Sequence, residues 1–276
     1  MPDNSLDKLQ LTVIILTLNN ADTIKNCIES VSWADEVLVY DSGSSDETPN
    51  IAKALGVKFI GDLKWSGFGE QRQKAQKYAK GEWLLWIDSD EEVSLMLKQS
   101  IQNCFVNASK EQVFSINRAT NFFGRFMRYS GWYPDRVVRL YARAHYQYNS
   151  AIVHEKVDCP SRYVTPLTGD ILHYTSNSFL SYMSKSLRYT DDWANQKYNN
   201  GHKVTLLGIV LRTKFAFVRK YIFKKGFLDG RHGLLLAMQS SHYTFNKYFA
   251  LWVLVEKEEL HKKNSGNRTS TSRKDN

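Results

Sequence analysis

Hydrophobic positions along residues 10–90 alternate between two periods. Short continuous runs of apolar and β-branched residues indicate strands buried on both faces, whereas apolar residues three or four positions apart indicate helices. A strand–helix alternation predicts βαβ units with right-handed crossovers, and therefore an α/β fold with a doubly wound, mainly parallel, Rossmann-like sheet. The expected strands are 11–17, 36–40, 57–60 and 83–87, and the expected helices are 21–32, 45–55 and 70–79.

Beyond Val93 the pattern is less regular. From Ser178 onward the spacing is helical and the sequence is basic, which predicts a helical C-terminal extension. We therefore divide the chain into a first domain (1–175), a basic helical extension (176–261) and a disordered tail (262–276) that has no large apolar residue. Within the first domain we expect a further helix over 95–105 and partly antiparallel strands over 112–117, 136–141 and 163–167.

The positive charge is concentrated near the C-terminus. The chain of 276 residues has a formal net charge of +9, and residues 171–276 contain 18 Lys and Arg against 7 Asp and Glu. Large apolar residues, several of them aromatic, are mixed with basic residues over 206–225, which suits an anionic membrane surface, although a core-packing helix with a solvated basic face explains the pattern equally well. No apolar run reaches the roughly 20 residues that span a bilayer, so we expect a peripheral association.

The N-terminus and the cysteines indicate a cytoplasmic protein. The first residues have no basic segment followed by an apolar one, so no secretory signal is expected. Cys27, Cys104 and Cys159 are widely spaced, which argues against a zinc ribbon or a disulfide framework. We therefore expect reduced thiols and a location at the inner face of the cytoplasmic membrane.

Polar and acidic residues follow three of the expected strands. In an open parallel sheet, ligands bind beyond the carboxyl ends of the strands, so these residues are candidates for one site. They are Thr17 and Asn19 after the first strand, Asp41 and Ser42 after the second, and Asp88 and Asp90 after the fourth.

Asp88 and Asp90 carry the most specific chemistry of this set. Strand residues two positions apart point to the same face, and two close carboxylates repel each other unless a cation lies between them. Mg²⁺ or Mn²⁺ fits such a pair and can also bind a diphosphate. The alternative is the acidic start of a helix, since Asp90, Glu91 and Glu92 would complement the helix dipole. The chain has neither GxGxxG nor GxxxxGK[ST], which disfavours a dinucleotide-binding fold and a P-loop.

The order strand-TLNN, strand-DSGSSD and strand-DSD resembles the family 2 inverting glycosyltransferases of the GT-A fold. The resemblance spans roughly residues 10–255, and its later segments are similar to those of lipopolysaccharide inner-core β-1,4-glucosyltransferases. It implies a nucleotide-sugar-binding and catalytic domain over 1–175, and metal-dependent, inverting transfer of glucose from UDP-glucose to a heptose of the lipid-linked inner core. The later segments are GWYPDRVVRLY, AIVHEKV, ILHYT and KKGFLDGRHGLLLA.

The resemblance also implies roles for the residues at the strand ends. Asp90 matches the metal ligand, and Asp88 matches an acid on the ribose or phosphate side of the donor. The usual pattern has a second acid at the position of Ser42, and that acid contacts the nucleoside. The resemblance therefore implies this contact less strongly for Ser42. The nucleoside-binding positions are Thr17, Asn19 and Asp41.

Two further groups of residues are candidates. Arg72 and Lys74, on the polar helix before the fourth strand, could contact the diphosphate or belong to a solvated helix face. An inverting transferase needs a general base at the acceptor hydroxyl, for which we favour Glu155 over Asp135, although either could form a surface ion pair. His154 and His173 are candidate diphosphate or metal contacts, and His173 could instead be a core histidine.

Two other functions compete with sugar transfer. A nucleotidyltransferase acting on a sugar phosphate also uses paired carboxylates and a metal, but the first strand is not followed by a glycine-rich loop with a lysine. A nucleic-acid-binding protein would explain the basic C-terminal part but not the acidic strand ends. We therefore expect a nucleotide sugar, a lipid-linked saccharide and an anionic membrane as partners, and no nucleic acid.

Overall fold

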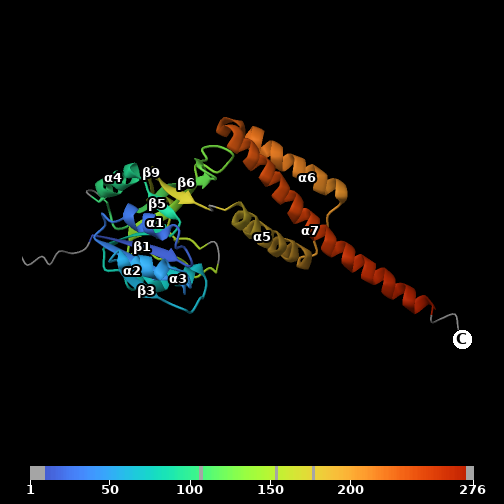
Figure 1. Cartoon of the computed structure of the whole chain (residues 1–276), viewed down its shortest axis with the longest axis horizontal. Coiled ribbons are helices and arrows are strands. Elements are labelled where there is room, and N and C mark those ends of the chain that lie inside the picture. Colours follow the sequence, from blue (N-terminus) through green and yellow to red (C-terminus); the bar gives the residue numbers. More distant parts are fainter. Residues whose placement is uncertain (1–9, 106–107, 153–154, 176–177, 272–276) are drawn as a thin grey trace, which may run out of the picture. The chain divides into compact units, whose positions relative to one another are not determined.

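The computed structural model describes residues 10–105, 108–152, 155–175 and 178–271, and two compact units divide the chain (Figure 1). The first unit comprises residues 1–121 and 133–174, and the second comprises residues 122–132 and 175–276. The strands are β1 (Leu11–Thr17), β2 (Glu36–Asp41), β3 (Lys58–Gly61), β4 (Trp83–Asp88), β5 (Glu91–Val93), β6 (Val113–Phe122), β7 (Arg125–Phe126), β8 (Arg136–Ala142) and β9 (Val164–Tyr174).

The helices follow the strands in the first unit and dominate the second. A π-helical turn, Arg219–Phe223, and two 3₁₀ turns, Ser161–Tyr163 and Gly226–Asp229, complete the regular structure. The α-helices are α1 (Ile24–Ser30), α2 (Thr48–Ala54), α3 (Phe68–Gln76), α4 (Leu95–Cys104), α5 (Phe179–Asn199), α6 (Leu206–Val218) and α7 (Gly230–Thr271).

The sheet has the strand order β3-β2-β1-β4-β8-β6-β9-β5, and β7 pairs with β6. The four strands β3, β2, β1 and β4 are mutually parallel, so their carboxyl ends meet at one edge. β8 joins antiparallel to β4, and β5 joins antiparallel to β9. The fold is therefore the expected α/β, GT-A type, with a mainly parallel sheet in the part of the chain that the structure describes.

Helices cover both faces of this sheet. Every residue of β1 is buried, as its continuous apolar run predicts. On one face, Val13 and Ile15 pack with side chains of α1, α2 and α4, and on the other face Ile14 and Leu16 pack with α3. The doubly wound architecture thus follows from alternate side chains of β1 facing two separate cores.

The segment after β4 differs from both alternatives that the sequence leaves open. β4 ends at Asp88, residues 89 and 90 form a turn, and Glu91–Val93 forms β5. The expectation that Asp88 and Asp90 share one face of a strand is therefore wrong, because the strand has ended before Asp90. The acidic residues do not begin a helix either, since β5 pairs with β9 and α4 begins only at Leu95.

The second unit is built from α5, α6 and α7. α7 contacts both of the other helices, and it packs against α5 through Ala194 of α5 and Leu251 and Val255 of α7. Asp229 is fully buried and accepts hydrogen bonds from the backbone N–H groups of Arg128 and Tyr129. These contacts attach residues 122–132 to the helical chain segment that follows residue 175.

α7 continues through residues 262–271, for which the sequence predicts a disordered tail. Extending an existing helix fixes one residue for each hydrogen bond gained, so a polar segment can follow a packed helix without a new nucleus. Residues 272–276 lie outside the described residues. Within the described part of the chain, no helix is both long and apolar enough to cross a bilayer.

Candidate active site at the carboxyl end of β4

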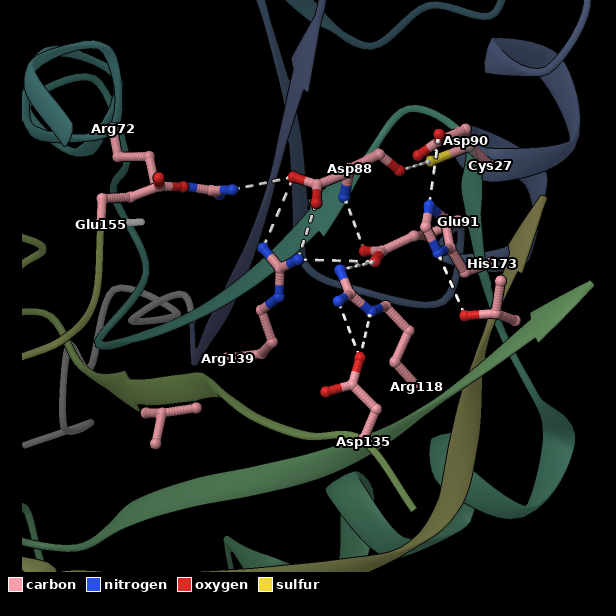
Figure 2. A network of polar contacts seen from close by, with 12 residues as sticks. Cys27, Arg72, Asp88, Asp90, Glu91, Arg118, Asp135, Arg139, Glu155 and His173 are labelled. Carbon is pink, nitrogen blue, oxygen red and sulfur yellow. Dashed lines mark hydrogen bonds and ion pairs between the residues drawn. The ribbon is translucent and has the colours of Figure 1, made fainter. Parts of the chain in front are cut away.

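A network of charged side chains surrounds the end of β4 (Figure 2). The Asp88 carboxylate accepts a hydrogen bond from Arg72 Nη2 at 2.9 Å and another from Arg139 Nη2 at 2.7 Å. Burial raises the pKa of the Asp88 carboxyl, but the charges of Arg139 and Arg72 outweigh it and hold that pKa well below its usual range. Asp88 is therefore an ionised group whose oxygens are shared by two guanidinium groups.

Arg72 reaches this network because α3 is attached to the segment before Glu155. The backbone N–H groups of Phe68 and Gly69 donate to the carbonyls of Ile152 and Ala151. A side chain at Gly69 would collide with the backbone of this segment, so the close approach requires glycine. The guanidinium of Arg72, 4.7 Å from the centre of the Tyr148 ring, then donates from Nε to Glu155 Oε1 at 3.0 Å.

Arg72 thus bridges two acids that lie far apart in the sequence. One guanidinium contacts both Asp88, at the end of β4, and Glu155, and the Arg72 side chain is only 4% exposed. A buried guanidinium that is paired on two sides holds both carboxylates in fixed orientations. The predicted donor-side acid and the favoured general base are therefore held by the same side chain.

Glu91 extends the network toward Asp135. Glu91 is fully buried, and its carboxylate accepts a hydrogen bond from the backbone N–H of Asp88 and lies 3.4 Å from Arg139 Nη2. Burial raises the pKa of Glu91, which the charge of Arg139 offsets only in part. Arg118 lies 3.9 Å from the same carboxylate and donates to Asp135 Oδ2 from Nε and Nη2, at 2.9 and 2.7 Å. Asp135, the second candidate base, is therefore paired with Arg118.

Asp90 lies apart from Asp88, beside His173 of β9 (Figure 2). Its Oδ2 is 3.4 Å from His173 Nε2, and both side chains are partly exposed. A carboxylate with an imidazole is a donor set that suits Mn²⁺ and is compatible with Mg²⁺. The described residues contain no cluster of three or more His, Cys, Asp or Glu side chains arranged for a metal. A cation here would take its remaining ligands from phosphate or water, as Mg²⁺ commonly does.

The loops after β1 and β2 are bound to each other. Asn19, which has a left-handed backbone with φ of 54°, accepts a hydrogen bond from the backbone N–H of Ser45 at 2.8 Å. The Asp41 carboxylate is buried and accepts from the backbone N–H groups of Gly43 and Ser44. The side chains of Asn19 and Asp41 thus form the turns at this edge of the sheet.

The remaining predicted site residues lie elsewhere. Thr17 is buried at the end of β1, and in the described part of the chain its hydroxyl has no hydrogen-bond partner. The backbone N–H of Ser42 donates to the Thr17 carbonyl. Lys74 pairs with Asp62 at 2.9 Å, and this hydrogen bond, together with those from the Lys64 backbone N–H and the Tyr40 hydroxyl, lowers the pKa of Asp62 to about 2. His154 lies outside the described residues.

The structure therefore brings together Arg72, Asp88 and Glu155, and separately Asp90 and His173. Arg118, Arg139 and the buried Glu91 also belong to the network but were not predicted as site residues from the sequence. Arg139 interrupts the apolar strand β8, and its side chain is only 6% exposed. A lone arginine inside an apolar strand is the one local signal that could have identified it, because a buried charge needs a partner.

Comparisons with known proteins identify the family of the chain. Residues 12–165 match the family model of "Glycosyl transferase family 2". A Rickettsia bellii protein named an uncharacterized glycosyltransferase is 26% identical over 90% of this chain and 86% of its own length. The lipopolysaccharide core biosynthesis glycosyltransferase LpsC of Rhizobium meliloti is 24% identical over 87% of this chain and 91% of its own length.

A solved structure is similar over a smaller part. Glucosyl-3-phosphoglycerate synthase from Mycobacterium tuberculosis, in complex with Mn²⁺, UDP and glucosyl-3-phosphoglycerate, is 23% identical with a TM-score of 0.35. The similarity covers 41% of this chain and 44% of that one. The family model, in contrast, matches more than half of the chain, including β1, β2, β4 and the network at the end of β4. The chain belongs to glycosyl transferase family 2 and is a glycosyltransferase.

Proposed function

We propose that this glycosyltransferase transfers a hexose, with inversion, from a nucleotide sugar to a lipid-linked saccharide of the lipopolysaccharide inner core. The specific donor that we propose is UDP-glucose, and the acceptor is a heptose. LpsC, a protein named for lipopolysaccharide core biosynthesis, supports this acceptor class, because the similarity extends over most of both chains. The observation that carries the proposal is the bridge from Asp88 through Arg72 to Glu155 at the ligand edge of the sheet.

The bridge suits a displacement reaction. Glu155 is proposed to accept the proton of the acceptor hydroxyl while the hydroxyl oxygen attacks the anomeric carbon and the bond from sugar to phosphate breaks. The leaving diphosphate gains negative charge, and Arg72 and Arg139 are the buried cations beside the predicted donor-side acid Asp88. Because Arg72 contacts Glu155 directly, it orients the base toward the same region.

Asp90 and His173 are the residues that we propose for a divalent cation, Mg²⁺ or Mn²⁺. Their side chains are close together and accessible, at the turn that follows β4. When bound, the cation would supply Lewis-acid stabilisation of the leaving diphosphate. Asp88 is a weaker candidate ligand than the sequence predicts, because both of its oxygens already accept from guanidinium groups.

The remaining contacts to the donor are proposed at the loops after β1 and β2. Thr17, Asn19, Asp41 and Ser42 lie at the carboxyl ends of these neighbouring parallel strands. Since the side chains of Asn19 and Asp41 form hydrogen bonds within the turns, their contribution to a nucleoside site is the shape of these loops. Lys74 is paired with Asp62, so it is proposed only as a longer-range positive charge.

We also propose that the second unit binds an anionic membrane surface. Over residues 206–228, large apolar side chains are exposed, and basic residues occur among them. Apolar side chains that enter the interface and cations that attract anionic lipid are the combination found in peripheral membrane helices. The exposed apolar side chains are Leu206, Leu207, Val210, Leu211, Phe215, Val218, Ile222, Phe223, Phe227 and Leu228.

A transfer assay tests the donor and the acceptor together. The purified chain is incubated with Mn²⁺, heptose-containing lipid-linked core saccharide, and a panel of UDP- and GDP-sugars, and the products are identified by mass spectrometry. The proposal predicts one hexose added per acceptor, with UDP-glucose the best donor. Transfer from GDP-sugars alone would refute the donor, and transfer only to acceptors without heptose would refute the acceptor.

A further inference from the structure

A cavity of about 440 Å³ lies within the second unit. α5, α7, the π-helical turn and Trp132 line it, so both of the chain segments that form this unit contribute. Its volume falls within the range of about 300–1,000 Å³ that is usual for small-molecule sites. We call it the helical-unit pocket, and its lining includes Trp132, Tyr182, Lys185, Lys220, Ser240 and Tyr243.

Positive charge lines the pocket. Lys185 and Lys220 line it, and none of its described lining residues is an Asp or Glu. Lys220 is half-buried, with Nζ 5.8 Å from the centre of the Trp132 ring. Burial, together with the charges of Arg219 and Lys224, lowers the pKa of Lys220 to about 8. A desolvated ammonium group is unfavourable unless an anion pairs with it, so the pocket is suited to an anionic ligand.

The rest of the lining is suited to a sugar. Aromatic rings of Trp132, Tyr182 and Tyr243 offer apolar surface in its lining. Ser240 and Gln239 add hydrogen-bonding groups at the same wall. A pyranose ring has an apolar face and a rim of hydroxyls, so it can use both kinds of surface. A simple inorganic anion would use only the lysines and would leave the aromatic walls without a partner.

We propose that the helical-unit pocket binds a phosphorylated sugar, with the phosphate at Lys185 and Lys220 and the ring against the aromatic side chains. A lysine ammonium group is a common phosphate ligand, and three donors on a flexible stem adapt to its oxygens. This identification rests on the proposed function: the phosphorylated sugar is a residue of the lipid-linked acceptor. The pocket then recognises a part of the acceptor other than the hydroxyl that reacts.

Binding of a defined sugar phosphate tests the pocket without any donor. Isothermal titration calorimetry on the full chain would compare trehalose 6-phosphate, trehalose and inorganic phosphate. We expect trehalose 6-phosphate to bind most tightly, and K220M to weaken its binding at least tenfold. The matched control K214M removes an exposed lysine of α6 that does not line the pocket, and it should leave this binding within twofold of the wild type.

Thermal unfolding separates a binding role from a structural one. Because Lys220 is desolvated and the described lining residues include no Asp or Glu, K220M should unfold at the same temperature as the wild type or above it. If K220M unfolds at a lower temperature, the variant K185M replaces it in the titration. Lys185 is exposed, so its removal leaves the packing of α5 unchanged.

Several outcomes would overturn the proposal. Equal affinity for trehalose 6-phosphate and inorganic phosphate would show an anion site with no preference for sugar. No binding of trehalose 6-phosphate, together with weaker binding of K220M than of K214M to phosphatidylglycerol vesicles, would assign the lysine to a lipid headgroup. The titrations contain no nucleotide sugar, so they test the pocket independently of sugar transfer. A protein that binds trehalose 6-phosphate in the titration but transfers no hexose in the transfer assay would refute the proposed function and leave the pocket assignment intact.

Discussion

The two aspartates of the Asp-Ser-Asp motif should differ sharply when each is replaced by asparagine. Asp88, whose side chain is 32% exposed, is held by two arginines that are only 4% and 6% exposed, whereas the 28% exposed Asp90 pairs with His173 among the described residues. D88N removes the charge that compensates two buried guanidinium groups. D90N removes one partly exposed contact, so its effect on folding should be small.

The network sets the size of the difference. Removing one partner of a buried ion pair costs about 3–5 kcal/mol of unfolding free energy. In D88N, Arg72 would still pair with Glu155 and Arg139 would still pair with Glu91. We therefore expect D88N to lose about 3 kcal/mol of unfolding free energy, the lower end of this range. D90N should cost less than about 1 kcal/mol. At roughly 2–4 °C per kcal/mol for a unit of this size, D88N should unfold about 6–12 °C below the wild type.

Differential scanning calorimetry and transfer kinetics on the same samples test this pair. D90N should lose transfer while its unfolding temperature stays near that of the wild type, and D88N should lose both transfer and stability. D158N, which removes an acid that is 68% exposed, serves as the control and should change neither. If D88N unfolds within 2 °C of D90N, Asp88 is not the anchor of the arginine pair and the account of the network is wrong.

Three further results are expected. E155Q should lower kcat by about 10²–10⁴-fold, the range for a lost general base, with little change in donor affinity. D135N should lower kcat much less. The reverse order would exchange the roles of the two acids, and normal transfer by both variants would refute a carboxylate base. Binding to phosphatidylglycerol vesicles should fall as salt rises past about 0.15 M, where the Debye length is about 8 Å, and equal binding to phosphatidylcholine vesicles at low salt would contradict an anionic partner. Hydrogen bonds from Lys74, the Lys64 backbone N–H and Tyr40 hold the folded-state pKa of Asp62 at about 2, below its unfolded value of about 3.9. The resulting stabilisation is complete above about pH 4 and is lost as the pH falls toward 2. Urea titrations should therefore show a shallower fall in stability with falling pH for D62N, and parallel curves would refute this contribution.

Local sequence was sufficient to predict the strands that form the ligand edge. The apolar runs of β1, β2 and β4 are long enough to be buried on both faces, and few alternatives exist for such runs in an alternating α/β pattern. Because β1, β2 and β4 are parallel neighbours, the polar residues after them lie at one edge of the sheet. The position of the candidate site could therefore be predicted from sequence patterns alone.

The partners within the site could not be predicted in this way. Arg139 contacts Asp88 because β8 lies beside β4 in the sheet, although three other strands, β5, β6 and β7, separate β4 from β8 along the chain. Strand order in space depends on long-range packing, which no local pattern reports. β5 was missed because three residues, two of them acidic, do not resemble a strand, and its pairing with β9 supplies the reason for its conformation.

Binding of UDP in the presence and absence of Mn²⁺ tests most directly whether the end of β4 is the donor site. Isothermal titration calorimetry would compare the wild type, D90N and D158N, with Mn²⁺ or with EDTA. The account predicts that Mn²⁺ strengthens UDP binding at least tenfold in the wild type and in D158N, and that D90N loses this gain while remaining folded. An equal Mn²⁺-dependent gain in D90N, or UDP binding that is unaffected by Mn²⁺ in the wild type, would contradict it.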